Sequence, residues 1–118
     1  MKLGIFAPTL SGGWVMSHTA PKIEPDWFLM QETALKAEHY GFEFLLAPNK
    51  YKGIGGAIDF WSYALDSFST MAALAAITKR IQLIPSISLL SVPPVYAAKQ
   101  VKTIADIAGP GRFGVNII

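Results

Sequence analysis

The chain has 118 residues, of which 52% are hydrophobic and 15% are charged, with a formal net charge of +2 and no cysteine. Its scattered lysines and arginines lack the clustering of a nucleic-acid-binding face, and the missing cysteines exclude disulfides and thiol catalysis. No run of about 20 apolar residues exists, so we expect no membrane-spanning helix, and no pattern predicts a secretory signal. We therefore expect one apolar domain of modest size, located in the cytoplasm and buried against further protein.

The chain opens on a short strand and a long loop. The apolar run 2–7, which Pro8 ends, predicts a strand buried on both faces, as in parallel sheets. The loop 8–25 carries Trp14 and His18. Loops of this length inside a domain are often functional, although the base rate for each such side chain favours simple packing.

The next segment predicts a helix and a second strand. Asp26 can cap a helix over 27–40, Gly41 can end it, and 42–47 reads as a buried strand. Spacings of three and four residues predict one apolar stripe along the helix. The stripe consists of Trp27, Met30, Ala34, Ala37 and Tyr40.

The remaining pattern repeats this alternation. A glycine-containing connection, 51–63, lacks the phosphate-loop and dinucleotide-binding patterns. It leads to a predicted helix over 65–78, a strand over 81–89 and a helix that Pro93-Pro94 starts and that runs to about Ile107.

The last stretch, 109–118, reads as a glycine turn that runs into a buried parallel strand. Asn116 is the polar side chain within this strand, and it should have a hydrogen-bond partner, because burying it bare costs roughly 1–3 kcal/mol. No helix or turn follows before Ile118, so we expect this to be the first part of a larger enzyme.

The resulting order is βαβαβαβ, which predicts an α/β fold with four parallel strands, three helices and right-handed crossovers. A doubly wound sheet and half of an eight-stranded barrel both fit. We favour the N-terminal half of a TIM (β/α)8 barrel, because the first loop has no helix N-terminus close behind it and a full barrel needs about 250 residues. Residues 1–118 would then be a single partial domain.

Many short stretches, in shared order and spacing, resemble one enzyme family. Two of the longer ones are Leu-Lys-Ala-Glu-His-Tyr-Gly-Phe at 35–42 and Gly-Arg-Phe-Gly-Val-Asn at 111–116. The others are 2–6, 13–14, 20–21, Lys50, Gly53, 55–56, 60–61, 67–68, Met71, 74–76, 80–82 and 93–94. The chain is thus similar to the bacterial-luciferase-like, flavin-dependent monooxygenases, and most of all to the pyrimidine (uracil) monooxygenases.

The resemblance implies a TIM barrel with reduced FMN at the carboxyl ends of the strands, in accord with the usual place of barrel active sites. It also implies oxygen activation on the flavin and opening of the pyrimidine ring, as part of pyrimidine catabolism. Electrons would come from NADH through a separate flavin reductase, and the enzyme would be a homo-oligomer. No metal is implied.

The resemblance also implies roles for particular residues. Flavin contacts carry over to Asn49, Lys50 and Asn116, and the oxygen pocket carries over to Leu46 and Ser86. Asn116, Ser86 and Leu46 would thus be the catalytic set.

Three residues differ from what the pyrimidine enzymes usually have. Ser86 stands in place of Thr, which keeps the hydroxyl, Pro48 in place of Met, and Asn49 in place of an aliphatic residue. The last two would fall beside the flavin and affect the substrate more than the superfamily.

Several alternatives remain open. Asn116 could instead satisfy the backbone of a neighbouring strand, and Lys50 could be an ordinary exposed loop residue. His39 favours a structural role, and Asp59 and Asp66 favour capping and solvation over an acid–base pair. The enzyme could also be a dimethyl-sulfone or alkanesulfonate type of monooxygenase. The chain could otherwise be a non-catalytic half-barrel that pairs with another chain through its exposed sheet edges, or an inactive fragment.

Overall fold

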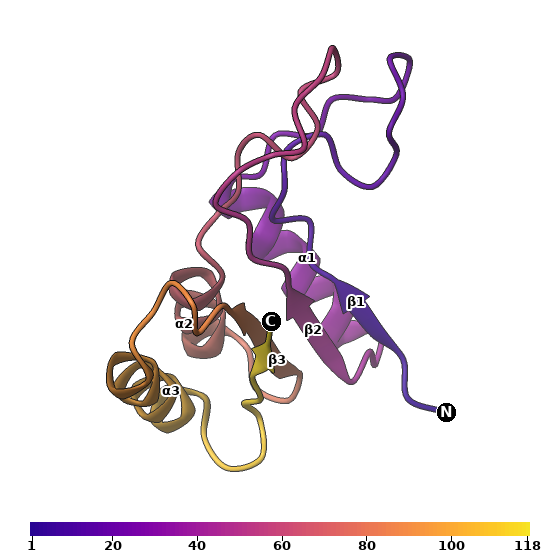
Figure 1. The fold of residues 1–118 in the computed structure, drawn as a ribbon. Coiled ribbons are helices and arrows are strands. Elements are labelled where there is room, and N and C mark those ends of the chain that lie inside the picture. Colours follow the sequence, from indigo (N-terminus) through magenta and orange to yellow (C-terminus); the bar gives the residue numbers. More distant parts are fainter.

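The computed structural model describes residues 1–118 and alternates strands with helices along the whole chain (Figure 1). In order, the elements are β1 (Gly4–Phe6), α1 (Trp27–His39), β2 (Phe44–Ala47), α2 (Ser67–Ile77), β3 (Gln82–Ile87), α3 (Pro94–Ala108) and β4 (Asn116–Ile117). The strands form one parallel sheet in the order β1-β2-β3-β4, so β1 and β4 are its edges. The predicted βαβαβαβ order and parallel direction are confirmed. No helix has both the length and the apolar character needed to cross a membrane.

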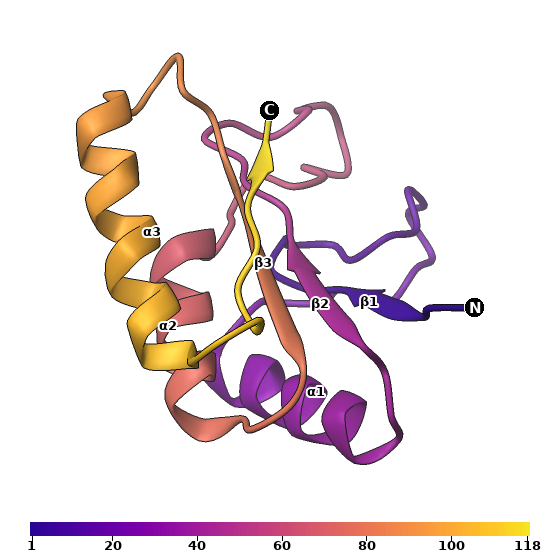
Figure 2. The ribbon, with the colours of Figure 1, turned by 90° about the horizontal axis from the view of Figure 1, so that it is seen from below.

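The core lies between the sheet and the helices, which all cover the same face of the sheet (Figure 2). Alternate strand residues such as Leu45, Ala47 and Leu83 point to that side and are buried. They pack with Met30 of α1 and Met71 of α2 in a single cluster. This arrangement explains the Ala-rich helices, because small side chains allow a helix to approach a sheet closely.

The other face of the sheet carries no helix, and we call it the open face. Our expectations that the first strand is buried on both faces and that the last strand is buried are wrong, since Phe6 is 52% exposed and Ile117 of β4 is 66% exposed. The strand register places alternate residues on this face. They are Gly4, Phe6, Phe44, Leu46, Gln82, Ile84, Ser86, Gly114, Asn116 and Ile118.

The helix starts follow the capping residues. Asp26 Oδ1 accepts a hydrogen bond from the Leu29 N–H at 2.7 Å, and Asp66 Oδ1 accepts one from the Ser69 N–H at 2.7 Å. Both capping predictions are confirmed. The predicted stripe of the first helix is confirmed at Met30, Ala34 and Ala37 and wrong at both ends, because Trp27 is 43% exposed and Tyr40, 74% exposed, lies beyond the end of α1 at His39.

Strand β4 is shorter than predicted because of Pro85 in β3. The chain is in register with β3 at Leu83↔Phe113 and again at Ser86↔Asn116, and the ladder is broken between these pairs. Proline has no N–H to donate to the neighbouring strand. The pairing therefore resumes only at the carboxyl end of β3, where it fixes the position of Asn116.

Arg112 joins the ends of two helices to the sheet. Its guanidinium donates from Nη1 to the Ala108 carbonyl at 2.8 Å and from Nη2 to Thr78 Oγ1 at 2.6 Å. Nε reaches the Ile81 carbonyl at 3.4 Å, and Thr78 in turn donates to the Leu74 carbonyl at 2.7 Å. One cation thus serves the carboxyl-terminal ends of both α2 and α3, where a positive charge is favoured.

Glu38, in the last turn of α1, binds the turn between α2 and β3. Its carboxylate accepts from the backbone N–H groups of Lys79 at 2.9 Å, Arg80 at 2.6 Å and Ile81 at 2.9 Å. Partial burial raises the pKa of the Glu38 carboxyl, but the N–H donors, Ile81 foremost, lower it by more, so the net pKa lies below its ordinary value of 4.5.

Glu38→Gln is expected to lower the free energy of unfolding by about 1 kcal/mol at pH 7, because hydrogen bonds to a charged acceptor are stronger than neutral ones. A lowered pKa in the folded state stabilises the fold above the ordinary pKa of 4.5, and this stabilisation disappears as pH falls through the folded-state value. Urea unfolding of the full-length protein at pH 7 and pH 3.5 would show the difference between the two proteins shrinking in acid. An equal difference at both values would refute the assigned role.

Candidate active site at the carboxyl ends of the strands

A polar pair lies on the open face where β3 and β4 end. Asn116 Nδ2 donates to Ser86 Oγ at 2.9 Å, and Ser86 is 1% exposed. Buried Ser67, the first residue of α2, donates from Oγ to the Ser86 carbonyl at 2.6 Å and holds that backbone in place. The expectation that Asn116 has a partner is confirmed, and the partner is a side chain rather than strand backbone.

The other predicted residues lie at the same end of the sheet. Leu46 shares the open face and is paired in register with Ile84, the residue two positions before Ser86 on β3. Asn49 and Lys50 come after β2 and Pro48, and neither side chain forms an ion pair or a hydrogen bond. The sheet therefore brings Leu46 and Ser86 onto one face, whereas Lys50 belongs to a second group of side chains among the loops.

The two long loops, 8–25 and 48–66, pair with each other beyond the ends of β1 and β2 (Figure 1). Leu10 and Ala64 form an antiparallel bridge. The Ser11 N–H donates to the Tyr63 carbonyl at 2.9 Å, and the Trp61 N–H donates to the Ser11 carbonyl at 3.2 Å. The loops thus form one structure at the carboxyl end of the sheet, which neither loop sequence indicated on its own.

The glycines of the second loop let it fold back on itself. Gly55 and Phe60 form an antiparallel bridge, and Gly55 and Gly56 have positive φ angles of 78° and 82°. A Cβ at Gly53 would lie 2.7 Å from the backbone nitrogen of Ser62, so only glycine fits this approach. The glycines predicted in this connection therefore shape a hairpin.

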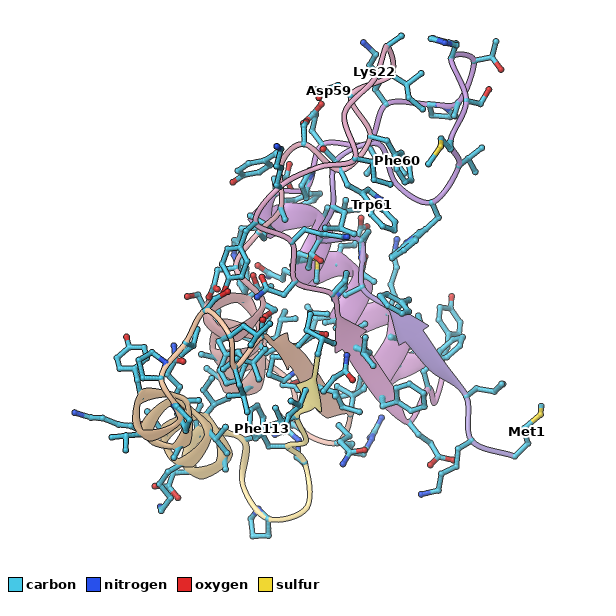
Figure 3. All side chains as sticks on the ribbon, in the orientation of Figure 1. Met1, Lys22, Asp59, Phe60, Trp61 and Phe113 are labelled. Carbon is cyan, nitrogen blue, oxygen red and sulfur yellow. The ribbon has the colours of Figure 1, made fainter.

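Aromatic rings connect the two loops above the sheet, where Figure 3 shows Phe60 and Trp61. The ring centroids of Phe6 and Trp14 are 4.7 Å apart, those of Trp14 and Trp61 are 5.4 Å apart, and those of Phe60 and Trp61 are 4.6 Å apart. Lys50 Nζ lies 5.4 Å from the Trp61 ring centroid, within range of a cation–π interaction. We call these four rings and Lys50 the aromatic cluster.

Two residues of this region escaped the sequence reasoning. Ser67 and Trp61 belong to the matching stretches, but no local pattern predicts their contacts. Ser67 donates a hydrogen bond to a carbonyl 19 residues away, and the Trp61 ring contacts Lys50 from another part of the same loop. His39, the last residue of α1, is exposed and lies against Tyr40, with ring centroids 5.1 Å apart.

A parallel sheet with helices on one face and polar side chains at its carboxyl ends is the arrangement found in enzymes of the (β/α)8-barrel class. The luciferase-like monooxygenase family profile matches residues 1–118, and the chain belongs to that family. It is 46% identical over its whole length to pyrimidine monooxygenase RutA of Bradyrhizobium sp., of which it covers 32%. The chain therefore spans about a third of the length of this relative.

Solved structures show the same fold. EDTA monooxygenase EmoA from Chelativorans sp. superposes with a TM-score of 0.80 at 17% identity, over 100% of this chain and 29% of the other. Riboflavin lyase RcaE, solved with modified FMN and riboflavin, gives a TM-score of 0.80 at 20% identity, over 100% of this chain and 29% of the other. The predicted fold, four parallel strands and three helices from the N-terminal part of a luciferase-like barrel, is confirmed.

Proposed function

We propose that the protein is an FMN-dependent monooxygenase that uses reduced flavin and O2 to open a pyrimidine ring. The observation that carries this proposal is the hydrogen-bonded pair of Asn116 and Ser86 on the open face, at the carboxyl end of a luciferase-like sheet. The 46% identity to a pyrimidine monooxygenase supports the choice of substrate. A dimethyl-sulfone or alkanesulfonate substrate is the alternative.

The open face suits a flavin ring, which is planar, apolar at one end and polar at the other. Phe6, Leu46 and Ile84 supply apolar surface along β1, β2 and β3, and Ser86 and Asn116 supply polar groups beside it. Sites for such ligands combine mostly apolar walls with a few placed polar groups. Reduced FMN bound here would supply the electrons and the reaction with O2.

The polar pair keeps donor hydrogens free for a ligand. An amide nitrogen carries two hydrogens, so Asn116 Nδ2 can donate one to Ser86 Oγ and direct the other across the open face. Ser86 Oγ accepts that bond, which leaves its own O–H to donate elsewhere. The Asn116 amide can therefore stabilise a developing negative charge on a flavin oxygen or on oxygen derived from O2, and the Ser86 hydroxyl, which is 1% exposed, holds that amide in place.

Lys50, after β2, would add a fixed positive charge near the flavin and favour negative charge on the reduced ring. Asn49 beside it would contact the cofactor. We also propose a separate flavin reductase that draws on NADH, a homo-oligomeric state and a place in the cytoplasm, in line with the enzymes that the sequence resembles.

Titration of the full-length protein with FMN, followed by oxidation assays with a flavin reductase, NADH and O2, tests this function. We expect saturable FMN binding and consumption of uracil, with dimethyl sulfone left unchanged. Oxidation of dimethyl sulfone instead of uracil would move the protein to the alternative class. A full-length protein that binds no FMN would contradict the assignment altogether.

A further inference from the structure

The second loop holds backbone strain at the carboxyl end of the sheet. Asp59 and Trp61 are the two residues other than glycine with positive φ, at 48° and 60°. A bulky residue such as Trp rarely adopts this conformation, because it raises the free energy of the folded state. It persists only where surrounding contacts enforce it. Such strain commonly marks a functional position.

The contacts around Trp61 enforce its conformation. Its backbone N–H donates to the Ser11 carbonyl at 3.2 Å, and its indole Nε1 donates to the Gly13 carbonyl at 2.8 Å. Its ring stacks on buried Phe60, with centroids 4.6 Å apart. The backbone, the indole N–H and one face of the ring are thus held by Ser11, Gly13 and Phe60, respectively.

The result of this fixation is the ring's position beside Lys50. Lys50 Nζ lies 5.4 Å from the Trp61 centroid, and Lys50 forms no ion pair. A carboxylate partner would hold the ammonium but neutralise it for any other ligand. An aromatic face restrains the flexible side chain and leaves its positive charge free for an anion.

We propose that Trp61 is a positioning residue that holds the Lys50 ammonium for the anionic reduced flavin. This inference rests on the proposed function. Trp61 itself need not touch the cofactor, since its effect passes through Lys50. The strain at Trp61 is then the cost of placing an aromatic face where the ammonium of the β2 loop must stay.

A double-mutant cycle in the full-length protein tests the proposal, with the dissociation constant of reduced FMN measured anaerobically. We expect Trp61→Leu to weaken binding about two- to fivefold, the equivalent of an exposed cation–π interaction. In a Lys50→Met background the same change should have almost no effect. Trp61→Phe, which keeps an aromatic face, should bind close to wild type. Tyr51→Leu is the matched control, because Tyr51 follows Lys50, is 67% exposed and touches none of these rings.

A second readout separates this inference from the proposed function. In NMR spectra of the flavin-free protein, the Lys50 side-chain methylenes should show upfield ring-current shifts that Trp61→Leu abolishes. Equal losses of FMN affinity in both Lys50 backgrounds, or unshifted Lys50 methylenes in the wild type, would overturn the positioning role even if FMN binds. If the Lys50 methylenes are shifted but the protein binds no FMN, the contact between Trp61 and Lys50 exists. Its assignment to flavin binding is then wrong, and so is the proposed function.

Discussion

Replacement of Asn116 by Ala is expected to lower the turnover rate of the full-length enzyme by about 10²–10³, the usual loss when one donor to a developing oxyanion is removed. The reason is geometric, since Asn116 Nδ2 is fixed by Ser86 Oγ at 2.9 Å and its second N–H remains available to a ligand on the open face. The reduced-flavin oxidation rate and the product yield, measured in single turnovers, would check this.

The controls come from the same face of the sheet. Ser86→Thr should retain most of the activity, because it keeps the hydroxyl that accepts from Asn116. Gln82→Ala changes a polar side chain on the same face but at the amino end of β3, and it should leave the rate unchanged. Unaltered turnover and FMN affinity in Asn116→Ala would remove Asn116 from the catalytic set.

Arg112→Met is expected to lower the free energy of unfolding by about 2–4 kcal/mol, the second large effect. Methionine keeps much of the apolar stem but donates to neither the Ala108 carbonyl nor Thr78 Oγ1. The carboxyl-terminal ends of α2 and α3 would both lose a charged partner. Urea unfolding of the full-length protein gives the measurement through the shift of the midpoint.

Lys102→Met is the matched control for Arg112. Lys102 pairs with Asp106 four residues along α3, and both side chains are exposed. Exposed pairs of this kind contribute about 0.3–0.5 kcal/mol, so the midpoint should hardly move. A similar loss of stability in both variants would show that Arg112 acts as a surface charge and does not tie the helices together.

Local patterns predicted the elements of this fold well. Asp26 and Asp66 precede their helices and cap them, because an N-cap needs only a side-chain oxygen three residues before the N–H that it serves. The same patterns missed the break in β4, which Pro85 causes from a strand some 30 residues away.

The site was only partly predictable for the same reason. Asn116 and Ser86 were assigned from the resemblance, and their mutual hydrogen bond depends on the register of β3 and β4. The roles of Glu38 and Trp61 rest on contacts made across loops and turns, where neither periodicity nor spacing gives a signal. Those contacts appear only once the chain is folded.

The most direct test of the account is a crystal structure of the full-length protein with bound FMN. We predict the isoalloxazine ring against the open face, in contact with Leu46 and with the Asn116 amide that Ser86 holds, with its negatively charged edge toward Lys50. A flavin bound on the helix-covered side of the sheet, or at the amino ends of the strands, would contradict the account.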